Sequence, residues 1–396
     1  MSQLVLLPHK DRSLARRHPW IFAGAVDRLD GRARPGDTVE VVAANGRPLA
    51  KAAWSPASKI RARVWTFDPA EVVDDAFFKR HIQAALERRQ SIPELRYQDG
   101  LRLLHGESDG LPGVIADRYG DTVVLQLTAA GADRWRRAII GALQRASGCA
   151  RIYERSDSDV RRLEGLDAVT GWVLGTAPAT PLTIVENGVR MQVDVTAGHK
   201  TGFYLDQREN RRLTRDLAAD RMTLNCFCYT GGFSLQALAG GAAHVLSIDS
   251  SAPALATAID NLALNPQLAA ERAEWRQADV FAELRTLRSA GQRFDLIILD
   301  PPKFAPSAAY AERAARAYRD INVLGFRLLN PGGLLMTYSC SGGIRGEHFQ
   351  QIVSDAALDA GRQARLLRRL AAPPDHPVAL HFGEGEYLKG LLCQVD

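Results

Sequence analysis

The stretch TLNCFCYTGGFSLQALAGGAAHVLSID (223–249) indicates a buried strand, a glycine turn, a helix and a second buried strand. This alternation continues toward the C-terminus and is typical of an open, mostly parallel sheet with helices on both faces. A final pair of strands, 381–382 and 387–394, is expected to flank 383–385 and close the sheet as a hairpin. The sequence therefore predicts an α/β fold with sheet strands at Thr223–Phe227, His244–Asp249, Trp275–Asp279, Phe294–Asp300 and Gly333–Cys340.

Three of these strand ends carry groups that suit an adenosine-type ligand. Gly231 and Gly232 allow the backbone to approach a ligand where a helix begins. Asp249, at the end of the second strand, can accept hydrogen bonds from both hydroxyls of a ribose. Asp279 and Val280, at the end of the third, are placed to contact an exocyclic adenine amine. Because a dinucleotide GxGxxG pattern is absent, the sequence favours an adenosine cofactor over a dinucleotide.

The fourth and fifth strands end in residues that suit chemistry on a base. Asp300 is followed by two prolines, which fix an extended backbone, and then by Lys303 and Phe304, a cation and an aromatic ring for a nucleic acid. Cys340 ends the fifth strand before Gly342-Gly343, where a thiol can be exposed and its pKa lowered. The other four cysteines (Cys149, Cys226, Cys228 and Cys393) are expected to be buried packing residues.

Basic charge is concentrated at the N-terminus. Residues 1–70 hold twelve Lys or Arg and six acidic residues, a net +6, which leaves −1 for the other 326 residues. Such a segment indicates a polyanionic partner, although a merely soluble basic surface stays an alternative. The strand 59–65 is expected to expose a basic face ending in an aromatic residue. The candidate RNA-binding residues here are Arg16, Arg17, Trp20, Lys59, Arg61 and Arg63.

The composition sets the remaining limits. The chain has 396 residues, 46% of them hydrophobic, which is enough for two to three domains. There is no apolar run of about 18 residues, so we expect no membrane contact through a transmembrane helix, and no signal peptide is recognised. Five cysteines without a CxxC pair favour the cytoplasm and argue against a metal site.

Several motifs together resemble one family, the bacterial large-subunit ribosomal RNA cytosine-C5 methyltransferase I family. They are RRHPWIFAGAV (16–26), SPASKIRARVW (55–65), HGESDGLPGVIADRYG (105–120), GHKTGFYLDQR (198–208), NCFCYTGGFS (225–234), LDPPKF (299–304) and YSCSGG (338–343). The resemblance spans nearly the whole chain. It implies a PUA RNA-binding domain at 1–70, a central α/β domain at 71–190 and a Rossmann-like methyltransferase domain at 191–396.

The resemblance also implies ligands and roles. The cofactor would be S-adenosylmethionine, the substrate one cytosine of 23S rRNA, and the assembly a homodimer. Gln207 or Arg208 would bind the methionyl carboxylate of the cofactor. The cofactor residues are expected to be Tyr204, Gln207, Arg208, Phe227, Tyr229, Thr230, Gly231, Gly232, Asp249, Asp279, Val280 and Asp300.

The expected chemistry assigns catalytic roles to Cys340 and Asp300. Carbon C5 of cytosine is too weak a nucleophile to take a methyl group directly, so the Cys340 thiolate adds first to C6, and Asp300 stabilises the charge at N3. Other RNA cytosine-C5 methyltransferases carry a second cysteine after the Asp-Pro pair, where this chain has Pro302 and Lys303. Release of Cys340 must then use another base or water, and the base that removes the C5 proton is not identified.

Three other functions stay open. A uracil-C5 methyltransferase also uses a Ser-Cys pair at this strand end, but typically reads Ser-Cys-Asn-Pro, and several members have an iron–sulfur cysteine cluster. A guanine-N methyltransferase needs no thiol. An RNA-binding assembly factor with a vestigial enzyme domain is the alternative from a different class.

Overall fold

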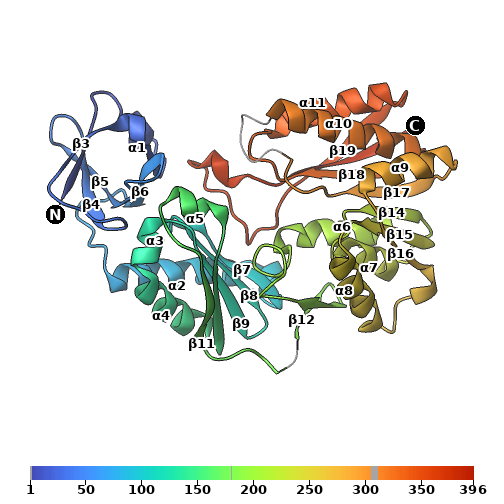
Figure 1. Cartoon of the computed structure of the whole chain (residues 1–396), viewed down its shortest axis with the longest axis horizontal. Coiled ribbons are helices and arrows are strands. Elements are labelled where there is room, and N and C mark those ends of the chain that lie inside the picture. Colours follow the sequence, from blue (N-terminus) through green and yellow to red (C-terminus); the bar gives the residue numbers. More distant parts are fainter. Residues whose placement is uncertain (1, 180, 305–310) are drawn as a thin grey trace. The chain divides into compact units, whose positions relative to one another are not determined.

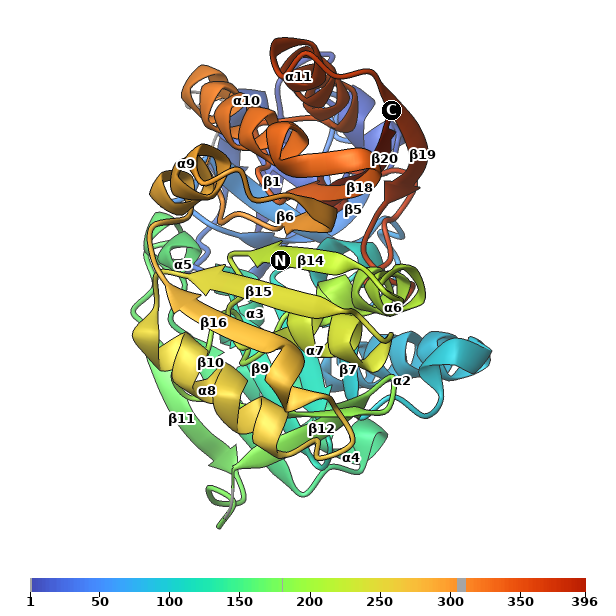
Figure 2. The same ribbon diagram turned by 90° about the vertical axis from the view of Figure 1, so that its right-hand side faces the viewer.

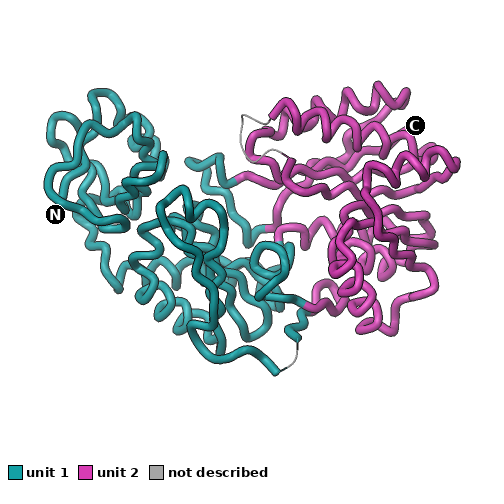
Figure 3. Tube along the Cα trace, in the orientation of Figure 1, with its two compact units in different colours: residues 1–184, 193–205, 374–385 teal, residues 185–192, 206–373, 386–396 magenta. Residues whose placement is uncertain are grey.

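The structure, a computed structural model, describes residues 2–179, 181–304 and 311–396. Their contacts divide the chain into two compact units, coloured separately in Figure 3. The first unit comprises 1–184, 193–205 and 374–385, and the second comprises 185–192, 206–373 and 386–396. Two segments that follow residue 191 thus belong to the first unit. The expected division into three domains at residues 70 and 190 stays a prediction.

The N-terminal part of the first unit is a sheet of order β2-β6-β5-β4-β1-β3 among the described residues (Figure 1). Its core contains Leu4, Val41, Ala62 and Val64. Asn45-Gly46 is a sequence pair typical of a hairpin turn, and β4 and β5 do pair antiparallel across it. The elements are β1 (Gln3–Leu6), α1 (Arg12–Ala15), β2 (Trp20–Phe22), β3 (Val26–Asp30), β4 (Thr38–Val42), β5 (Pro48–Trp54) and β6 (Ile60–Thr66).

The expected basic face of β6 is not exposed along its length. Arg63 is 6% exposed, and its Nη1 donates to Glu164 Oε1 at 2.7 Å. Trp65 is buried, with its ring 5.2 Å from that of Phe78. The expectation of a solvent-facing strand was wrong here, because residues 71–174 of the same unit cover this face of the N-terminal sheet.

The central part of the first unit is a sheet of order β11-β10-β9-β8-β7 over the described ranges, with α2 and α4 packed in its core. The sequence pattern predicts strands at 122–127 and 151–154 and helices at 75–89 and 132–146, which β9, β10, α2 and α4 confirm, whereas β7, β8, α5 and β11 were not predicted. The elements are α2 (Asp75–Ser91), β7 (Gly100–His105), β8 (Val114–Tyr119), β9 (Thr122–Leu127), α3 (Ala130–Arg134), α4 (Arg136–Ser147), β10 (Arg151–Ser156), α5 (Asp159–Leu163) and β11 (Val169–Leu174). A two-stranded sheet of β12 (Leu182–Glu186) and β13 (Val189–Val193) follows.

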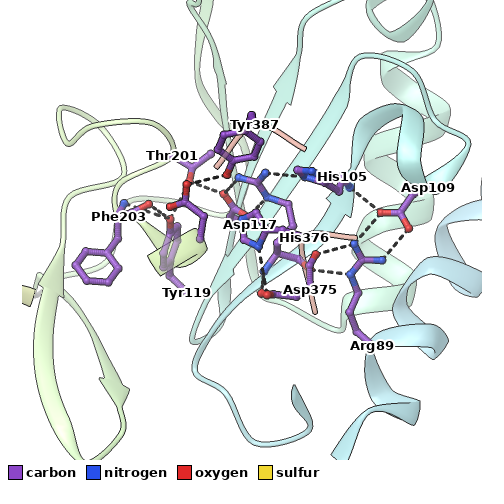
Figure 4. A network of polar contacts seen from close by, with 12 residues as sticks. Arg89, His105, Asp109, Asp117, Tyr119, Thr201, Phe203, Asp375, His376 and Tyr387 are labelled. Carbon is purple, nitrogen blue, oxygen red and sulfur yellow. Dashed lines mark hydrogen bonds and ion pairs between the residues drawn. The ribbon is translucent and has the colours of Figure 1, made fainter. Parts of the chain in front are cut away.

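A buried polar network joins the two later segments of the first unit to its central sheet (Figure 4). Asp375 Oδ2 accepts the backbone N–H of Arg102 at 2.9 Å, and Arg89 Nη2 donates to the Asp375 carbonyl at 2.9 Å. Thr201 Oγ1 donates to Asp117 Oδ2 at 2.6 Å. Segments 374–385 and 193–205 are therefore held in place by hydrogen bonds to buried polar groups rather than by apolar contacts alone.

His105 makes the stability of the first unit depend on pH. Its Nδ1 lies 3.0 Å from Arg102 Nη1, which can only donate, so Nδ1 accepts and the ring is neutral. Burial and the nearby charge of Arg102 lower the pKa of His105 from 6.5 to about 2. The unfolded chain then binds one proton more between these values. The stabilisation is complete above pH 6.5 and falls below it by up to about 1.4 kcal/mol per pH unit.

We therefore expect His105→Gln to flatten the decrease in the free energy of unfolding between pH 7 and pH 5. Urea denaturation at each pH measures this decrease. The control His348→Gln changes an exposed histidine on α11 (Gly346–Asp359) and should follow the wild type. The same pH dependence in His105→Gln and wild type would contradict the assignment.

The second unit is built on a sheet of order β16-β15-β14-β17-β18-β20-β19 within the ranges described. Helices α9, α10 and α11 cover one face, and α6, α7 and α8 cover the other (Figures 1 and 2). The first five strands in this order run parallel, as predicted. The remaining elements are α6 (Arg208–Leu217), β14 (Met222–Cys226), α7 (Gly232–Ala239), β15 (His244–Asp249), α8 (Ala252–Ala263), β16 (Ala273–Gln277), α9 (Val280–Ser289), β17 (Phe294–Leu299), α10 (Ala311–Leu328), β18 (Leu329–Ser339), β19 (Ala364–Leu370) and β20 (Lys389–Val395).

The C-terminal hairpin uses a different first strand from the one expected. β20 pairs antiparallel with β19 and β18, whereas residues 383–385 form a short 3₁₀ helix rather than a hairpin turn. Phe382 instead packs in the first unit, with its ring 4.9 Å from that of Trp20. The placement of a strand at 381–382 was wrong because Phe382 is buried by that contact. None of the helices in the described ranges is long and apolar enough to span a membrane.

Candidate active site

The candidate active site is the edge of the second unit's sheet where its parallel strands end. Cys226 of β14 lies opposite Leu299 of β17, which in turn lies opposite Thr337 of β18. Strand order reverses between β14 and β17, so loops leave to opposite sides at this point. Ligands of open α/β sheets bind at such a switch point, outside the carboxyl ends of the strands.

The backbone of the turn after β14 has a conformation that lets a ligand approach it closely. Phe227 and Tyr229 adopt positive φ values of 60° and 50°, which residues other than glycine rarely do. Strain of this kind is concentrated at ligand sites. Gly231 has φ +83°, and a Cβ there would lie 2.8 Å from the ring of Trp275, so this position requires glycine. The backbone N–H of Tyr229 donates to Asp249 Oδ2 at 2.8 Å, which ties the turn to the next strand end.

Two further residues of this turn complete its lining. The Thr230 carbonyl accepts from Asn261 Nδ2 at 3.0 Å, whereas Thr230 Oγ1 is buried and has no hydrogen-bond partner among the described residues. Gly232 is buried and starts α7. An unpartnered buried hydroxyl beside a helix start fits a polar ligand that supplies the missing hydrogen bond.

The second and third strand ends carry the two expected carboxylates. Asp249 is half-buried, and its Oδ1 accepts the N–H of Ser251 at 2.9 Å, so each oxygen keeps capacity for a ligand hydroxyl. Asp279 is exposed and caps α9, with Oδ1 accepting from Ala282 N–H at 2.9 Å. Val280 is buried. This part of the edge therefore fits the ribose and base of an adenosine.

Asp300 and Cys340 follow the ends of neighbouring strands. Asp300 comes directly after β17 and Cys340 directly after β18, and both are half-buried. Adjacent strands lie about 4.8 Å apart, so their ends share one corner of the sheet edge. Pro301 is buried behind this corner.

Lys303 and Phe304 differ in their surroundings. Lys303 is exposed, as a contact to nucleic acid requires. Phe304 is half-buried, with its ring 4.8 Å from that of Tyr318 and 6.1 Å from that of Phe281. The Phe304 ring thus packs with those of Tyr318 and Phe281, and its stacking on an RNA base stays a prediction.

Cys340 is distinguished from the other four cysteines by exposure. Cys149, Cys226, Cys228 and Cys393 are all buried, which confirms the expectation for them, whereas Cys340 is half-buried. Burial raises the pKa of each buried thiol, that of Cys393 to about 11. No cluster of side chains suited to a metal ion occurs among the residues described.

The cofactor-binding residues expected around the start of α6 are divided between the two units. Tyr204 belongs to the first unit, where its hydroxyl lies 3.1 Å from His199 Nδ1 and Lys200 Nζ lies 4.4 Å from its ring. Gln207 and Arg208 belong to the second unit and are each 1% exposed. A buried guanidinium at the start of α6 fits an anionic group such as a carboxylate.

Sequence reasoning missed two contacts of the second unit. Tyr387 donates its hydroxyl proton to Asp206 Oδ2 at 2.7 Å, beside Gln207. Lys389 Nζ donates to the Ser341 carbonyl at 2.8 Å, beside Cys340. Both contacts bring residues near the C-terminal end of the sequence to residues far earlier in it, so no local pattern could have indicated them.

The N-terminal basic residues are only partly available to a polyanion. Arg16, Arg17 and Lys59 are exposed. Arg61 is half-buried, with its guanidinium 5.9 Å from the ring of Trp54 and a hydrogen bond to the Pro56 carbonyl. Trp20 is half-buried and donates from Nε1 to Glu107 Oε1 at 2.8 Å.

Comparison with known proteins agrees with this geometry. Residues 142–392 match the S-adenosylmethionine-dependent methyltransferase family model, and residues 4–67 match a PUA-like domain model. A putative SAM-dependent methyltransferase from Streptococcus mutans has the same fold, with a TM-score of 0.85, 21% identity and complete coverage of both chains. A solved putative methyltransferase complexed with SAH gives a TM-score of 0.85 at 22% identity, also with complete coverage of both.

Curated relatives extend over nearly the whole chain. A protein of Salmonella arizonae named ribosomal RNA large subunit methyltransferase I is 49% identical over 393 residues, covering 99% of this chain and 97% of the relative. A protein of Cronobacter sakazakii with the same name is also 49% identical, covering 99% of each. The chain therefore belongs to the ribosomal RNA large subunit methyltransferase I family of S-adenosylmethionine-dependent methyltransferases.

Proposed function

We propose that this protein methylates C5 of one cytosine in 23S ribosomal RNA through a covalent bond between Cys340 and the base. One observation carries this proposal: the half-buried thiol of Cys340 follows the end of β18, beside the strand that ends before Asp300. The names of the curated relatives support large-subunit ribosomal RNA as the substrate. The expected homodimer stays a prediction of the resemblance.

The residues of the turn and the strand ends would hold the cofactor. Asp249 would accept from the ribose hydroxyls, Gly231 would let the backbone approach, and Arg208 would bind the carboxylate. Asp279 and Val280 would contact the adenine. When bound, S-adenosylmethionine supplies an electrophilic methyl group.

Cys340 and Asp300 would then make C5 reactive. The Cys340 thiolate would form an S–C6 bond, the C5=C6 pair would become a C4=C5 bond, and the C4=N3 pair would take a proton from Asp300 at N3. After C5 is methylated, the C5 proton would pass to water, the C5=C6 bond would form again as the S–C6 bond breaks, and the proton on N3 would return to Asp300. The thiolate leaves in the form in which it entered.

Transfer of label from tritiated S-adenosylmethionine to 23S rRNA lacking this modification tests the function. Bisulfite sequencing of the product should then map one protected cytosine. Label on uracil or guanine would contradict the base assignment and favour one of the other methyltransferases. No incorporation, with cofactor and RNA still bound, would favour an assembly factor.

The exposed basic residues lead to a prediction about RNA affinity. We expect the double variant Arg16→Glu/Arg17→Glu to weaken RNA binding. The magnitude of the slope of log K against log salt should fall by about 1 to 2, because fewer phosphates are neutralised and fewer counterions are released on binding. Filter binding at several salt concentrations measures the slope.

The matched control is Arg288→Glu/Arg293→Glu. Both arginines are exposed: Arg288 lies in the last turn of α9 and Arg293 directly before β17, at the opposite end of the strands from the candidate site. Equal slopes for the two double variants would show that the N-terminal basic residues do not contact RNA.

A further inference from the structure

Lys389 is a buried cation that forms no ion pair with a carboxylate of the described residues. It begins β20, lies opposite Ser339 in the register and is 8% exposed. Its Nζ donates to the Ser341 carbonyl at 2.8 Å, and the described residues provide no ion pair for it. Removing an ammonium from water is costly unless hydrogen bonds or a nearby negative charge compensate for it.

The charges around Lys389 point to one candidate partner. Burial, the largest influence, lowers the pKa of Lys389, and Lys303 acts in the same direction, whereas Cys340 and Glu386 raise it. Glu386 is exposed, so water screens its charge. Cys340, in contrast to Glu386, is half-buried. It directly precedes Ser341, to whose carbonyl Lys389 is hydrogen-bonded.

Helix α10 contributes a phenol beside Ser341. Tyr318 of α10 approaches with its hydroxyl 3.0 Å from Ser341 Oγ. Burial raises the pKa of Tyr318, and the charge of Cys340 acts in the same direction, so the phenol stays neutral. The ammonium is therefore the group best placed to stabilise a negative charge on the sulfur.

We propose that Lys389 is the positioning residue that holds Cys340 as a thiolate, through its ammonium charge and its hydrogen bond to the Ser341 carbonyl. This inference rests on the proposed function where it makes Cys340 the nucleophile. The S–H proton passes to water, the ammonium keeps its own protons, and the sulfur retains the electron pair that attacks C6.

The charge of Lys389 also affects the release of Cys340 from the methylated base. This chain has Pro302 and Lys303 where related enzymes carry a second cysteine. A thiolate stabilised by a neighbouring cation is a better leaving group, because a sulfur with a lower pKa leaves faster. Lys389 would thus assist both formation and cleavage of the S–C6 bond.

The pH dependence of alkylation of Cys340 by iodoacetamide tests the pairing without RNA or cofactor. Cys340 is the one cysteine of the five that is not buried, so peptide mass spectrometry of the native protein reports on it directly. In the wild type we expect the midpoint to lie below the ordinary thiol value of about 8.5. A wild-type midpoint at or above that value overturns the proposal, whatever the variants do.

Variants separate charge from packing. Lys389→Met should raise the midpoint by at least about one pH unit and slow alkylation at pH 7 about tenfold, and Lys389→Arg should restore most of both. The matched control is Lys51→Met, which removes another buried lysine that donates to a backbone carbonyl, that of Glu71 at 2.6 Å in the first unit. An unchanged midpoint in folded Lys389→Met refutes the pairing.

Methyl transfer by Cys340→Ala distinguishes failure of this inference from failure of the proposed function. If that variant methylates RNA normally, the nucleophile assignment fails, even where the Lys389 variants shift the thiol midpoint. If it is inactive and the midpoint does not respond to Lys389, the function stands and the pairing fails.

Discussion

Replacing Cys340 by alanine should abolish methyl transfer, lowering turnover by at least about 10³-fold. The reason is that C5 of cytosine gains its nucleophilic character only while sulfur is bonded to C6. The residues that would bind the cofactor belong to other strand ends, so the Kd for S-adenosylmethionine should stay within about twofold of the wild type. Tritium transfer measures the first quantity and calorimetric titration measures the second.

Cys393→Ala is the matched control for this variant. It removes a thiol that is buried in β20 opposite Leu335 of β18, away from the strand end that carries Cys340, and should leave methyl transfer near the wild-type rate. Turnover by Cys340→Ala close to that of Cys393→Ala would remove the thiol from the mechanism. A nitrogen of the RNA base would then attack the methyl group directly, as in a guanine-N methyltransferase.

Much of this site could be predicted because its residues are set by local pattern. An apolar run followed by glycine, aspartate or Asp-Pro-Pro indicates the end of a buried strand, and parallel strands place their ends on one edge. Asp249, Asp279, Asp300 and Cys340 were found in this way, and the structure places all four at that edge.

The sequence could not reveal which parts of the chain pack against each other. The alternation of Arg61, Arg63 and Trp65 predicted an exposed face, yet Arg63 and Trp65 are buried by residues that follow later in the chain. Lys389 was likewise not singled out within its apolar strand, because its one hydrogen-bond acceptor is 48 positions away. Side-chain periodicity identifies which residues share one face of a strand, but not which other element packs against that face.

The buried network of the first unit provides the second large effect. The side chain of Asp109 is 0% exposed, and it accepts from Arg88, from both terminal nitrogens of Arg89 and from the N–H of His105, at 2.7–2.9 Å. Burial opposes its ionisation, but the hydrogen bonds and charge of Arg89 outweigh this and lower the pKa of Asp109. The carboxylate is therefore charged at neutral pH.

Asp109→Ala should reduce the free energy of unfolding of the first unit by about 3–5 kcal/mol. Arg89 is 2% exposed, and its guanidinium donates to Asp109 and to the carbonyls of Ala85, Arg102 and Asp375, so it cannot turn to water. Without Asp109 it becomes a buried charge without its counter-ion. Urea denaturation followed by tryptophan fluorescence measures the loss, with a midpoint expected to fall by at least about 1 M.

Asp359→Ala is the control for Asp109→Ala, because it breaks an ion pair that is exposed rather than buried. Asp359 forms an ion pair with Arg319 at 2.6 Å, but the two side chains are 43% and 48% exposed, so its removal should change stability by less than about 1 kcal/mol. Equal small losses in both variants would mean that water reaches Arg89 once Asp109 is gone. A large loss confined to Asp109→Ala would instead locate the stability of segment 374–385 in the buried pair, because Arg89 holds that segment through the Asp375 carbonyl.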